Sequence, residues 1–442
     1  MAVKTAVGET DRVNIPAIAQ QGGTWGPMMF SNSIDVVGKY CKDNKKFYSY
    51  KNMVNVIPLA MVDDLLAVTR CGMESIDMNT SINSIIELKK LRFHTPVENK
   101  KTKCHIMHIG SNGKACPEIK VHGHTVDSVS QAVYLGDVIS QDGSNTGHIK
   151  DRVSKGMGQM NTVMNLLKTV SFGNRYFEIA VTLREAHLIN GMLSSTDILY
   201  GLKNKEVEQF EEVDKMLIRN ILNAPISSCI ESLYLELGLT PINIILKSRR
   251  IAYYHYLVNL DESEMLYKFF VAQYKYPVKD DWTLQVVQDL KDFGIPEHFN
   301  YMRSKKKSAF TRVLKIKTKE YTLDHLLNLK AKHSKMDNLM YTELKMQNYL
   351  KSENITVQEA QNLFRFRVGV AQFKANFGDR YTNKACPLCS LNLDTQVHSV
   401  QCEGIRDKVT IKGKYSDIFK QKVPSDISQT LLKISKLRED YI

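Results

Sequence analysis

An apolar stretch interrupted by two adjacent aspartates most constrains what this chain can fold into. Residues 55–62 are mostly apolar, Asp63 and Asp64 follow, and residues 65–68 are apolar again. Short apolar runs on both sides of a turn-forming pair predict a hairpin of two buried strands with the carboxylates at its tip. Burying neighbouring carboxylates is costly unless a cation or hydrogen-bond donors neutralise them. The alternative interpretation is an ordinary Asp-Asp turn.

Magnesium is the cation that such a pair is expected to bind. Mg²⁺ is held in proteins by one or two carboxylates together with substrate phosphates. Phosphoryl transfer, in which two metal ions stabilise the attacking and leaving oxygens, requires this arrangement. Asp63 and Asp64 are therefore candidate catalytic residues and candidate magnesium ligands.

Three cysteines and a histidine near the C-terminus have the spacing of a zinc site. Cys386 and Cys389 are separated by two residues, and His398 and Cys402 follow. Three thiolates and one imidazole make a closed tetrahedral ligand set for Zn²⁺, whose binding should fold a segment too short to hold a core by itself. The alternative is a set of free thiols. Three of the eight cysteines lie in this segment, and residues 1–10 lack the apolar core of a signal peptide, which favours metal ligation over a disulfide framework.

The charge of the chain points to a polyanionic partner. Its 442 residues carry a net charge of +13, and the isoelectric point is about 9.1. A surplus of this size favours nucleic acid or an anionic membrane surface, and the length allows about two to three domains. No apolar run approaches the roughly 20 residues of a membrane span. We therefore expect a soluble, intracellular protein that binds nucleic acid.

Most of the net positive charge is concentrated between residues 301 and 351, which contain 13 Lys and Arg but only four Asp and Glu. Such a run is either a solvated surface or a set of contacts to the nucleic-acid backbone, which position a strand without reading its sequence. The candidate binding residues are Lys305, Lys306, Lys307, Arg312, Lys315 and Lys317, with Lys319 continuing the run. The lysine triplet is also consistent with nuclear import.

A glycine-containing loop precedes the aspartate pair. Gln21 and Gly22 are followed by Gly23, Gly26 and Pro27. Glycine lets a backbone approach a ligand closely, and proline suits the first turn of a helix. The loop could present backbone donors to a phosphate or a base, or it could be a plain junction between a loop and a helix.

The remaining periodicities predict strands before residue 147 and helices after it. Met78, Ile82, Ile85 and Ile86 form one apolar stripe, which predicts an amphipathic helix over residues 75–93. Strands are predicted at 104–109, 118–121 and 134–139, with a turn at 122–124. Helices are predicted from 147 to 167 and at 175–200, 206–222 and 241–260.

The helix predicted at 241–260 interleaves basic and aromatic side chains, which are Lys247, Arg249, Arg250, Tyr253, Tyr254 and Tyr256. This pattern is typical of a surface that meets phosphates and stacks on bases. It also fits tyrosines packed between helices with the arginines in solvent.

Several segments resemble, in order, the reverse transcriptases of non-LTR (LINE-type) retrotransposons. The palm of that family is similar to the Gln21-Gly22 loop with Pro27 and Phe30, to Val62-Asp63-Asp64, to residues 100–110, and to residues 134–140 with Asp142-Gly143. The zinc knuckle that follows the polymerase in that family is similar to residues 373–377 and the Cys386-Pro387-Leu388-Cys389 segment with Asp394 and His398.

This resemblance implies an α+β fold and an RNA-directed DNA polymerase that uses two Mg²⁺ ions and, at the knuckle, Zn²⁺. Asp63 would be a metal ligand with Asp64 supporting it, and Gln21 and Gly22 would shape the nucleotide pocket. The partners would be an RNA template and a DNA primer or target. The regions implied are a partial palm (1–145) with an antiparallel sheet, a helical thumb (146–262), a basic helical linker (263–380), and the zinc knuckle with a tail (381–442).

Four features depart from the family pattern. The palm of the family carries a further catalytic aspartate on an earlier strand, but Asp11 is too close to Gln21 to take that place, and the fingers have no counterpart. Met61 replaces an aromatic residue, and Gly26 stands where serine is frequent. We therefore expect the chain alone to be an inactive, nucleic-acid-binding remnant, and the competing hypothesis is an active polymerase.

Overall fold

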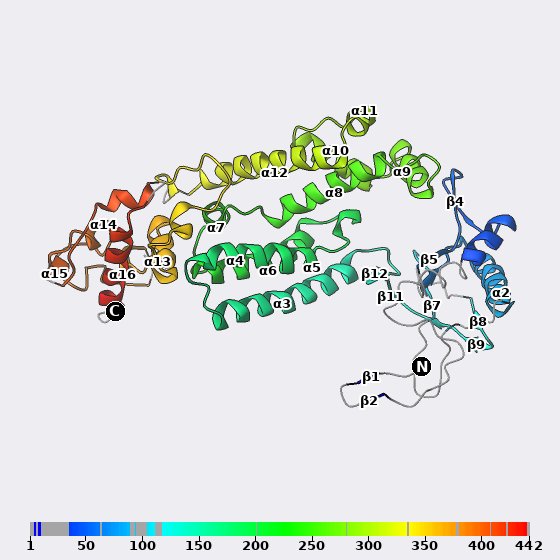
Figure 1. Ribbon diagram of the computed structural model, residues 1–442, viewed down its shortest axis with the longest axis horizontal. Helices are drawn as coiled ribbons and strands as arrows, with labels where there is room; N and C mark the ends of the chain where they lie inside the picture. Colours follow the sequence, from blue (N-terminus) through cyan, green and yellow to red (C-terminus); the bar gives the residue numbers. More distant parts are fainter. Residues whose placement is uncertain are drawn as a thin grey trace. The chain divides into compact units, whose positions relative to one another are not determined.

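The computed structural model shows a mostly helical protein with small two-stranded sheets (Figure 1). The residues that it describes are 4–5, 8–9, 35–61, 64–88, 93, 104–110, 117–199, 201–279, 281–333, 336–376, 380–406, 408–420 and 423–439. They form two compact units. The first comprises Met1–His148 and Asp261–Tyr276, and the second comprises Ile149–Leu260 and Pro277–Ile442. The four regions implied by the sequence stay a prediction.

The strands of the first unit associate only in pairs. The antiparallel pairs are β1 (Lys4–Thr5) with β2 (Gly8–Glu9), β3 (Tyr48–Tyr50) with β4 (Val54–Val56), β5 (Leu59–Met61) with β6 (Asp64–Leu66), β8 (Lys120–Val121) with β9 (His124–Thr125), and β11 (Gln131–Tyr134) with β12 (Asp137–Ser140). The strands β7 (His105–Ile106) and β10 (Asp127–Ser128) pair in parallel. Within the described residues, the predicted antiparallel sheet is thus present only as separate pairs.

The hairpin predicted around the aspartate pair is confirmed, but the burial of its strands is not. Leu59 pairs with Leu66, and Met61 pairs with Asp64. Met61 is 58% exposed, and Asp64 is exposed as well. The prediction of buried strands was wrong because each strand has only three residues and pairs with no third strand among the described residues. Asp63 lies outside the described residues.

The predicted amphipathic helix of the first unit is confirmed as α2 (Gly72–Leu88). Its buried residues are Met78, Ile82, Ile85 and Ile86, the four residues of the predicted stripe. They share a core with Val37 and Cys41, which belong to a helical segment over residues 35–43. The helix α9 (Met265–Lys275) also belongs to this unit, and its Phe269 ring stacks on Tyr50 at a centroid distance of 4.2 Å.

The single strand predicted at 134–139 is instead a tight hairpin. Tyr134 pairs with Asp137, so that Leu135 and Gly136 alone form the turn. Their φ angles of 50° and 86° are both in the left-handed region. A two-residue hairpin turn of the favoured type requires such angles at both positions, and glycine adopts them without strain. Periodicity could not detect this turn because the flanking apolar residues read as one run.

The second unit consists mainly of helices, and none of the described helices has the length and apolar character needed to cross a bilayer. Its α-helices are α3 (Thr146–Thr169, which begins in the first unit), α4 (Tyr176–Leu183), α5 (Asn190–Met192), α6 (Asn204–Leu222), α7 (Ile230–Leu237), α8 (Ile242–Val258), α10 (Trp282–Asp292), α11 (Phe299–Arg303), α12 (Lys307–Lys330), α13 (Val357–Arg367), α14 (Gln396–Ser399), α15 (Glu403–Arg406) and α16 (Ser425–Glu439). Short 3-10 helices cover Gly173–Arg175, Thr196–Ile198, Asn348–Lys351, Lys374–Asn376 and Tyr415–Phe419.

One continuous hydrophobic cluster connects these helices, from Ile149 in α3 to Ile434 in α16. Figure 1 shows α12 running beside α8, and the two helices are in contact, as are α13 and α16. The predicted helices at 206–222 and 241–260 are confirmed by α6 and α8. The helix predicted at 175–200 is continuous only from Tyr176 to Met192, and a π-helical segment, Arg184–Ile189, joins α4 to α5 within it.

A buried ion pair lies at this irregular segment. Arg184 and Asp214 have side chains that are 1% and 0% exposed, and the guanidinium donates two hydrogen bonds of 2.6 Å to the carboxylate. The hydroxyl of Tyr234 donates to the same carboxylate at 3.0 Å. The pair therefore links α6, α7 and the π-helical segment inside the core.

Charge pairing shows how the basic side chains of α8 are held in the second unit. Arg250 is buried and binds Asp289 at 2.7 Å, and Lys247 forms an ion pair with Asp292. Tyr254 is buried and donates to the carbonyl of Glu297. Packing between helices, the alternative interpretation, is thus confirmed for Tyr254, but Arg250 is inside the protein rather than in solvent.

Replacing Asp214 by asparagine should destabilise the second unit, because the buried Arg184 would lose its counter-charge. We expect the free energy of unfolding to fall by about 3–5 kcal/mol, measured by urea unfolding followed by circular dichroism. The matched control is Asp151→Asn, which breaks an exposed pair with Lys155 (2.7 Å). Exposed pairs contribute at most about 1 kcal/mol. Equal losses in the two variants would contradict the importance of the buried pair.

Candidate metal centre

The first two cysteines of the predicted zinc site lie on a tight loop. An isolated β-bridge joins Ala385 to Leu393, and the amide of Cys386 donates to the carbonyl of Asn392 at 2.8 Å. The amide of Ser390 donates back to the carbonyl of Cys386 at 2.8 Å. These bonds close the loop, so that two cysteines two residues apart can ligate the same ion.

The other two ligands are positioned by short helices. Thr395 caps α14, and its hydroxyl accepts a hydrogen bond from the amide of His398 at 3.1 Å. Cys402 immediately precedes α15. Gly404 in α15 approaches the loop so closely that an added Cβ would lie 2.6 Å from the carbonyl oxygen of Leu388. Glycine is therefore needed at this position to bring α15 against the loop.

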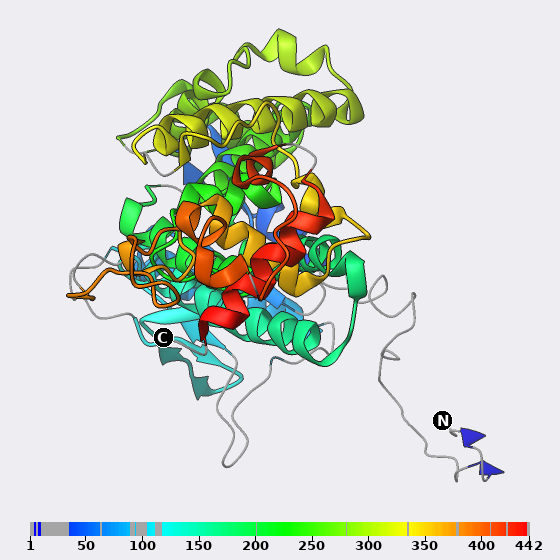
Figure 2. The same ribbon diagram turned by 90° about the vertical axis from the view of Figure 1, so that its left-hand side faces the viewer.

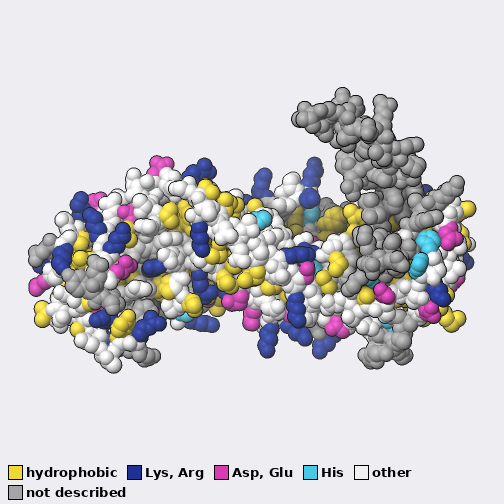
Figure 3. Space-filling model, turned by 90° about the horizontal axis from the view of Figure 1, so that it is seen from below, with side chains coloured by type: hydrophobic (Ala, Val, Ile, Leu, Met, Phe, Trp, Pro, Cys, Tyr) yellow, Lys and Arg dark blue, Asp and Glu magenta, His cyan; other side chains and the backbone are white. Residues whose placement is uncertain are grey.

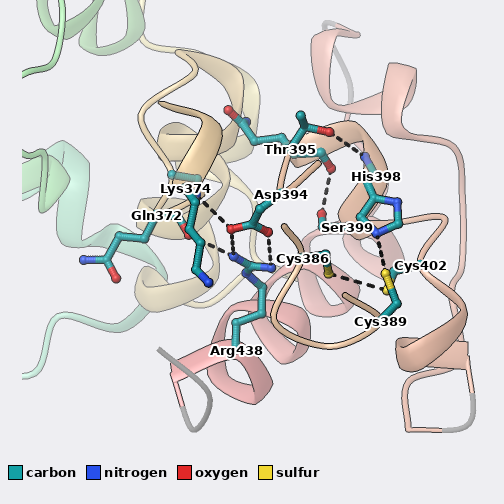
Figure 4. Close-up of polar contacts among 12 residues, drawn as sticks. Gln372, Lys374, Cys386, Cys389, Asp394, Thr395, His398, Ser399, Cys402 and Arg438 are labelled. Carbon is teal, nitrogen blue, oxygen red and sulfur yellow. Dashed lines mark hydrogen bonds and ion pairs between the residues drawn. The ribbon is translucent and has the colours of Figure 1, made fainter. Parts of the chain in front are cut away.

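The four predicted ligands converge as the sequence spacing predicts, and the cluster could hold zinc (Figure 4). The sulfur atoms of Cys386 and Cys402 are 3.8 Å apart, and the sulfur of Cys389 is 3.3 Å from Nε2 of His398. All four ligand atoms lie within 4.8 Å of one another. Two thiolates bound tetrahedrally at about 2.3 Å from Zn²⁺ are separated by about 3.8 Å, so the site needs little adjustment to bind the ion.

Two thiols of the cluster have pKa values shifted in opposite directions. The pKa of Cys389 is lowered to about 6, chiefly because the sulfur accepts a hydrogen bond from the amide of Leu391. Burial, followed by the hydrogen bond with Cys386, raises the pKa of Cys402 to about 12. At neutral pH Cys402 therefore carries a proton that a bound ion must displace, and the affinity for metal should rise with pH.

A buried ion pair holds the metal loop against the C-terminal helix. Asp394, which lies between Cys389 and His398 in the sequence, is fully buried. Its carboxylate accepts a hydrogen bond from the amide of Lys374 at 2.8 Å. Arg438 of α16 donates to the same carboxylate at 2.7 Å (Figure 4). Its guanidinium also lies 4.3 Å from the centre of the Phe373 ring. The sequence did not reveal Arg438 as a partner, because nothing in local spacing connects it to residue 394.

The metal segment belongs to the core of the second unit. Cys386 and Cys402 are 1% and 0% exposed, and both are members of the cluster that begins in α3. Gln396 of α14 donates to the carbonyl of Phe366 in α13 at 2.8 Å. Figures 1 and 2 show α13 and α16 side by side next to this segment. The expected small knuckle is therefore packed into a larger helical body.

The other predicted site residues are less well placed. Gln21, Gly22 and Asp63 lie outside the described residues. Asp64 is close enough to Tyr134 to raise the pKa of that phenol, although burial is the larger cause. Within the described part of the chain, no group of three candidate metal ligands includes Asp64. Nothing in the structure thus supports magnesium binding.

Of the six predicted nucleic-acid-binding residues, Lys305 and Lys306 immediately precede α12, and the remaining ones lie in its first half. The ammonium of Lys305 lies over the Tyr301 ring at 5.6 Å, and Lys317 binds Glu320 at 2.9 Å. The other four, together with Lys319, are exposed and have no carboxylate within ion-pair distance among the described residues. These five residues, which we call the basic face of α12, are Lys306, Lys307, Arg312, Lys315 and Lys319.

Cobalt substitution should report the predicted site, because thiolate–Co²⁺ charge-transfer absorption scales with the number of thiolate ligands. We expect Cys386→Ser to weaken this absorption strongly, and the affinity of the unchanged chain to fall as the pH is lowered from 8 to 6. Cys71→Ser is the control because Cys71 is exposed and outside the cluster. Equal spectra for both variants would contradict the assignment.

Replacing Arg438 by methionine should leave the Asp394 carboxylate buried without its counter-charge. We expect the free energy of unfolding to fall by about 3–5 kcal/mol, measured by chemical denaturation of the metal-loaded protein. Lys436→Met, at an exposed position of the same helix, is the control and should change stability little. A stability unchanged in Arg438→Met would show that the ion pair is not needed to hold the loop.

Searches against protein-family models, curated proteins and solved structures found no match to this chain. Its function must therefore be inferred from the geometry of the metal centre and from the surface of α12.

Proposed function

We propose that this chain is a nucleic-acid-binding protein of the non-LTR reverse-transcriptase type, which holds RNA or DNA through the basic face of α12. The observation that carries the proposal is the exposure of five cations without carboxylate partners among the described residues. A cation already paired with a carboxylate gains little from a phosphate, as for Lys247 and Arg250 of α8. Unpaired cations keep their full attraction for the backbone of a nucleic acid.

The spacing of the basic face suits a nucleic-acid strand. Arg312, Lys315 and Lys319 recur at three and four residues, which places them on one side of the helix. They span about 10 Å at a rise of ~1.5 Å per residue. About three phosphates occupy that length of one strand of a duplex. Contacts of this kind give affinity and register without sequence preference.

The metal centre supports the same proposal. Zinc knuckles contact single-stranded or structured nucleic acid, as inferred from the sequence. Here the centre would act from a rigid position, because α13 and α16 hold the metal loop in the core.

RNA-directed DNA polymerase activity is the second candidate. The observation that favours it is the β5–β6 hairpin. Strand β5 ends at Met61 and strand β6 begins at Asp64, an arrangement similar to the carboxylate hairpin of a polymerase palm. Mg²⁺-dependent primer extension on an RNA template, abolished in Asp64→Ala, would establish this activity. Extension at background level in the unchanged chain would leave binding as the function.

Neutralising the exposed side of α12 should weaken nucleic-acid binding. For Arg312→Gln, Lys315→Gln and Lys319→Gln combined, we expect lower affinity for single-stranded RNA and a less steep dependence on salt. The slope of log K against log[salt] should fall by about 2, because each phosphate neutralised on a single strand contributes ~0.7 to that slope. Fluorescence anisotropy at several salt concentrations measures both quantities.

The control must remove the same charge elsewhere, because Figure 3 shows Lys and Arg side chains spread over another face of the second unit as well. Lys168→Gln, Lys205→Gln and Lys433→Gln combined serve this purpose, since all three lysines are exposed. Equal weakening by both triple variants would mean that net charge alone attracts the nucleic acid. Binding that is insensitive to salt would contradict the proposal altogether.

A further inference from the structure

A second cluster of metal-ligating side chains lies away from the predicted zinc centre. Cys229 caps the N-terminus of α7, and Glu231 lies in the first turn of that helix. His333 lies in the turn after α12, where its amide donates to the carbonyl of Lys330 at 2.8 Å. The sulfur, one carboxylate oxygen and one imidazole nitrogen of these three residues all lie within 4.8 Å of one another.

The three side chains converge on one carboxylate oxygen. The thiol of Cys229 donates to Oε2 of Glu231 at 2.7 Å, and Nε2 of His333 is 3.7 Å from the same oxygen. Cys229 and Glu231 are half-buried, whereas the His333 side chain is 48% exposed. Direct packing between α7 and α12 places these residues near one another. Leu233 and Leu326, one from each of these helices, are members of the core cluster.

The chemistry of this set is that of a zinc site with an open position. Zn²⁺ accepts sulfur, nitrogen and oxygen ligands, and sites with three protein ligands keep a fourth position for water. Burial, followed by the hydrogen bond with Glu231, raises the pKa of the Cys229 thiol to about 12, so a bound cation must displace its proton. The set therefore provides two anionic ligands and one neutral ligand for a divalent cation.

We propose that Cys229, Glu231 and His333 bind a second zinc ion, with a water molecule as the fourth ligand. Binding replaces the S–H···O hydrogen bond by bonds from the ion to sulfur and oxygen, and the thiol proton passes to solvent. The ion would connect the N-terminus of α7 to the turn after α12. It would thereby brace the end of the helix that carries the basic face, and solvent would reach it beside the exposed His333.

Metal stoichiometry of the full chain tests this inference. Protein stripped by a chelator is titrated with Zn²⁺ alone, and the bound ions are counted by native mass spectrometry and by elemental analysis. We expect two ions in the unchanged chain and one in His333→Ala and in Cys229→Ser. In these two variants, the charge-transfer absorption of the Cys386 site with Co²⁺ should remain. Cys386→Ser alone should retain one ion, and the double variant Cys386→Ser, His333→Ala should bind none.

His298→Ala is the matched control, because His298 is exposed and belongs to neither cluster. It should retain both ions. Because His333 is exposed, His333→Ala should disturb the fold less than Cys229→Ser. Circular dichroism verifies that each variant is folded. One ion in the unchanged chain would overturn the proposal. A second ion retained in both His333→Ala and Cys229→Ser would be an adventitious ion only, and would overturn it equally.

Discussion

The carboxylate of Glu236 in α7 is a buried charge at which distant segments of the second unit are joined. It is fully buried, and Arg367 of α13 and the hydroxyl of Tyr341 donate to it at 3.1 Å and 2.7 Å. The same arginine donates to the carbonyl of Ile418. A carboxylate in such surroundings is tolerated only when cations and donors neutralise it, and its partners are therefore held in place. Three segments that are distant in sequence meet at this residue.

Both metal-ligand clusters are attached to this arrangement. The residues Cys229 and Glu231 belong to the start of α7, the helix that carries Glu236. The loop of Cys386 lies against α13, which carries Arg367, through the hydrogen bond of Gln396 to Phe366. Metal binding at either cluster would therefore act on the stability of the whole helical unit rather than on a separate small module.

The helix α12 carries both buried apolar residues and exposed cations. Phe310, Leu314 and Leu326 are buried, and they hold the helix in the second unit. Arg312, Lys315 and Lys319 are exposed on the remaining surface. Because the apolar residues fix the orientation of the helix, the cations of the proposed surface would meet a phosphate without a large loss of conformational freedom. This division explains how a basic segment is both an ordered helix and a candidate binding surface.

Local spacing in the sequence determined the stripe of α2, the helices α6 and α8, the hairpin at Asp64, and the convergence of Cys386, Cys389, His398 and Cys402. These features arise within one helix, one turn or one short segment of the chain, where the backbone geometry relates near neighbours directly. Only the tertiary structure decided the exposure of the β5–β6 strands, the pairing of Arg438 with Asp394, and the meeting of Cys229 with His333. Those contacts depend on how helices pack against one another, and residues distant in the chain carry no spacing from which that packing can be read.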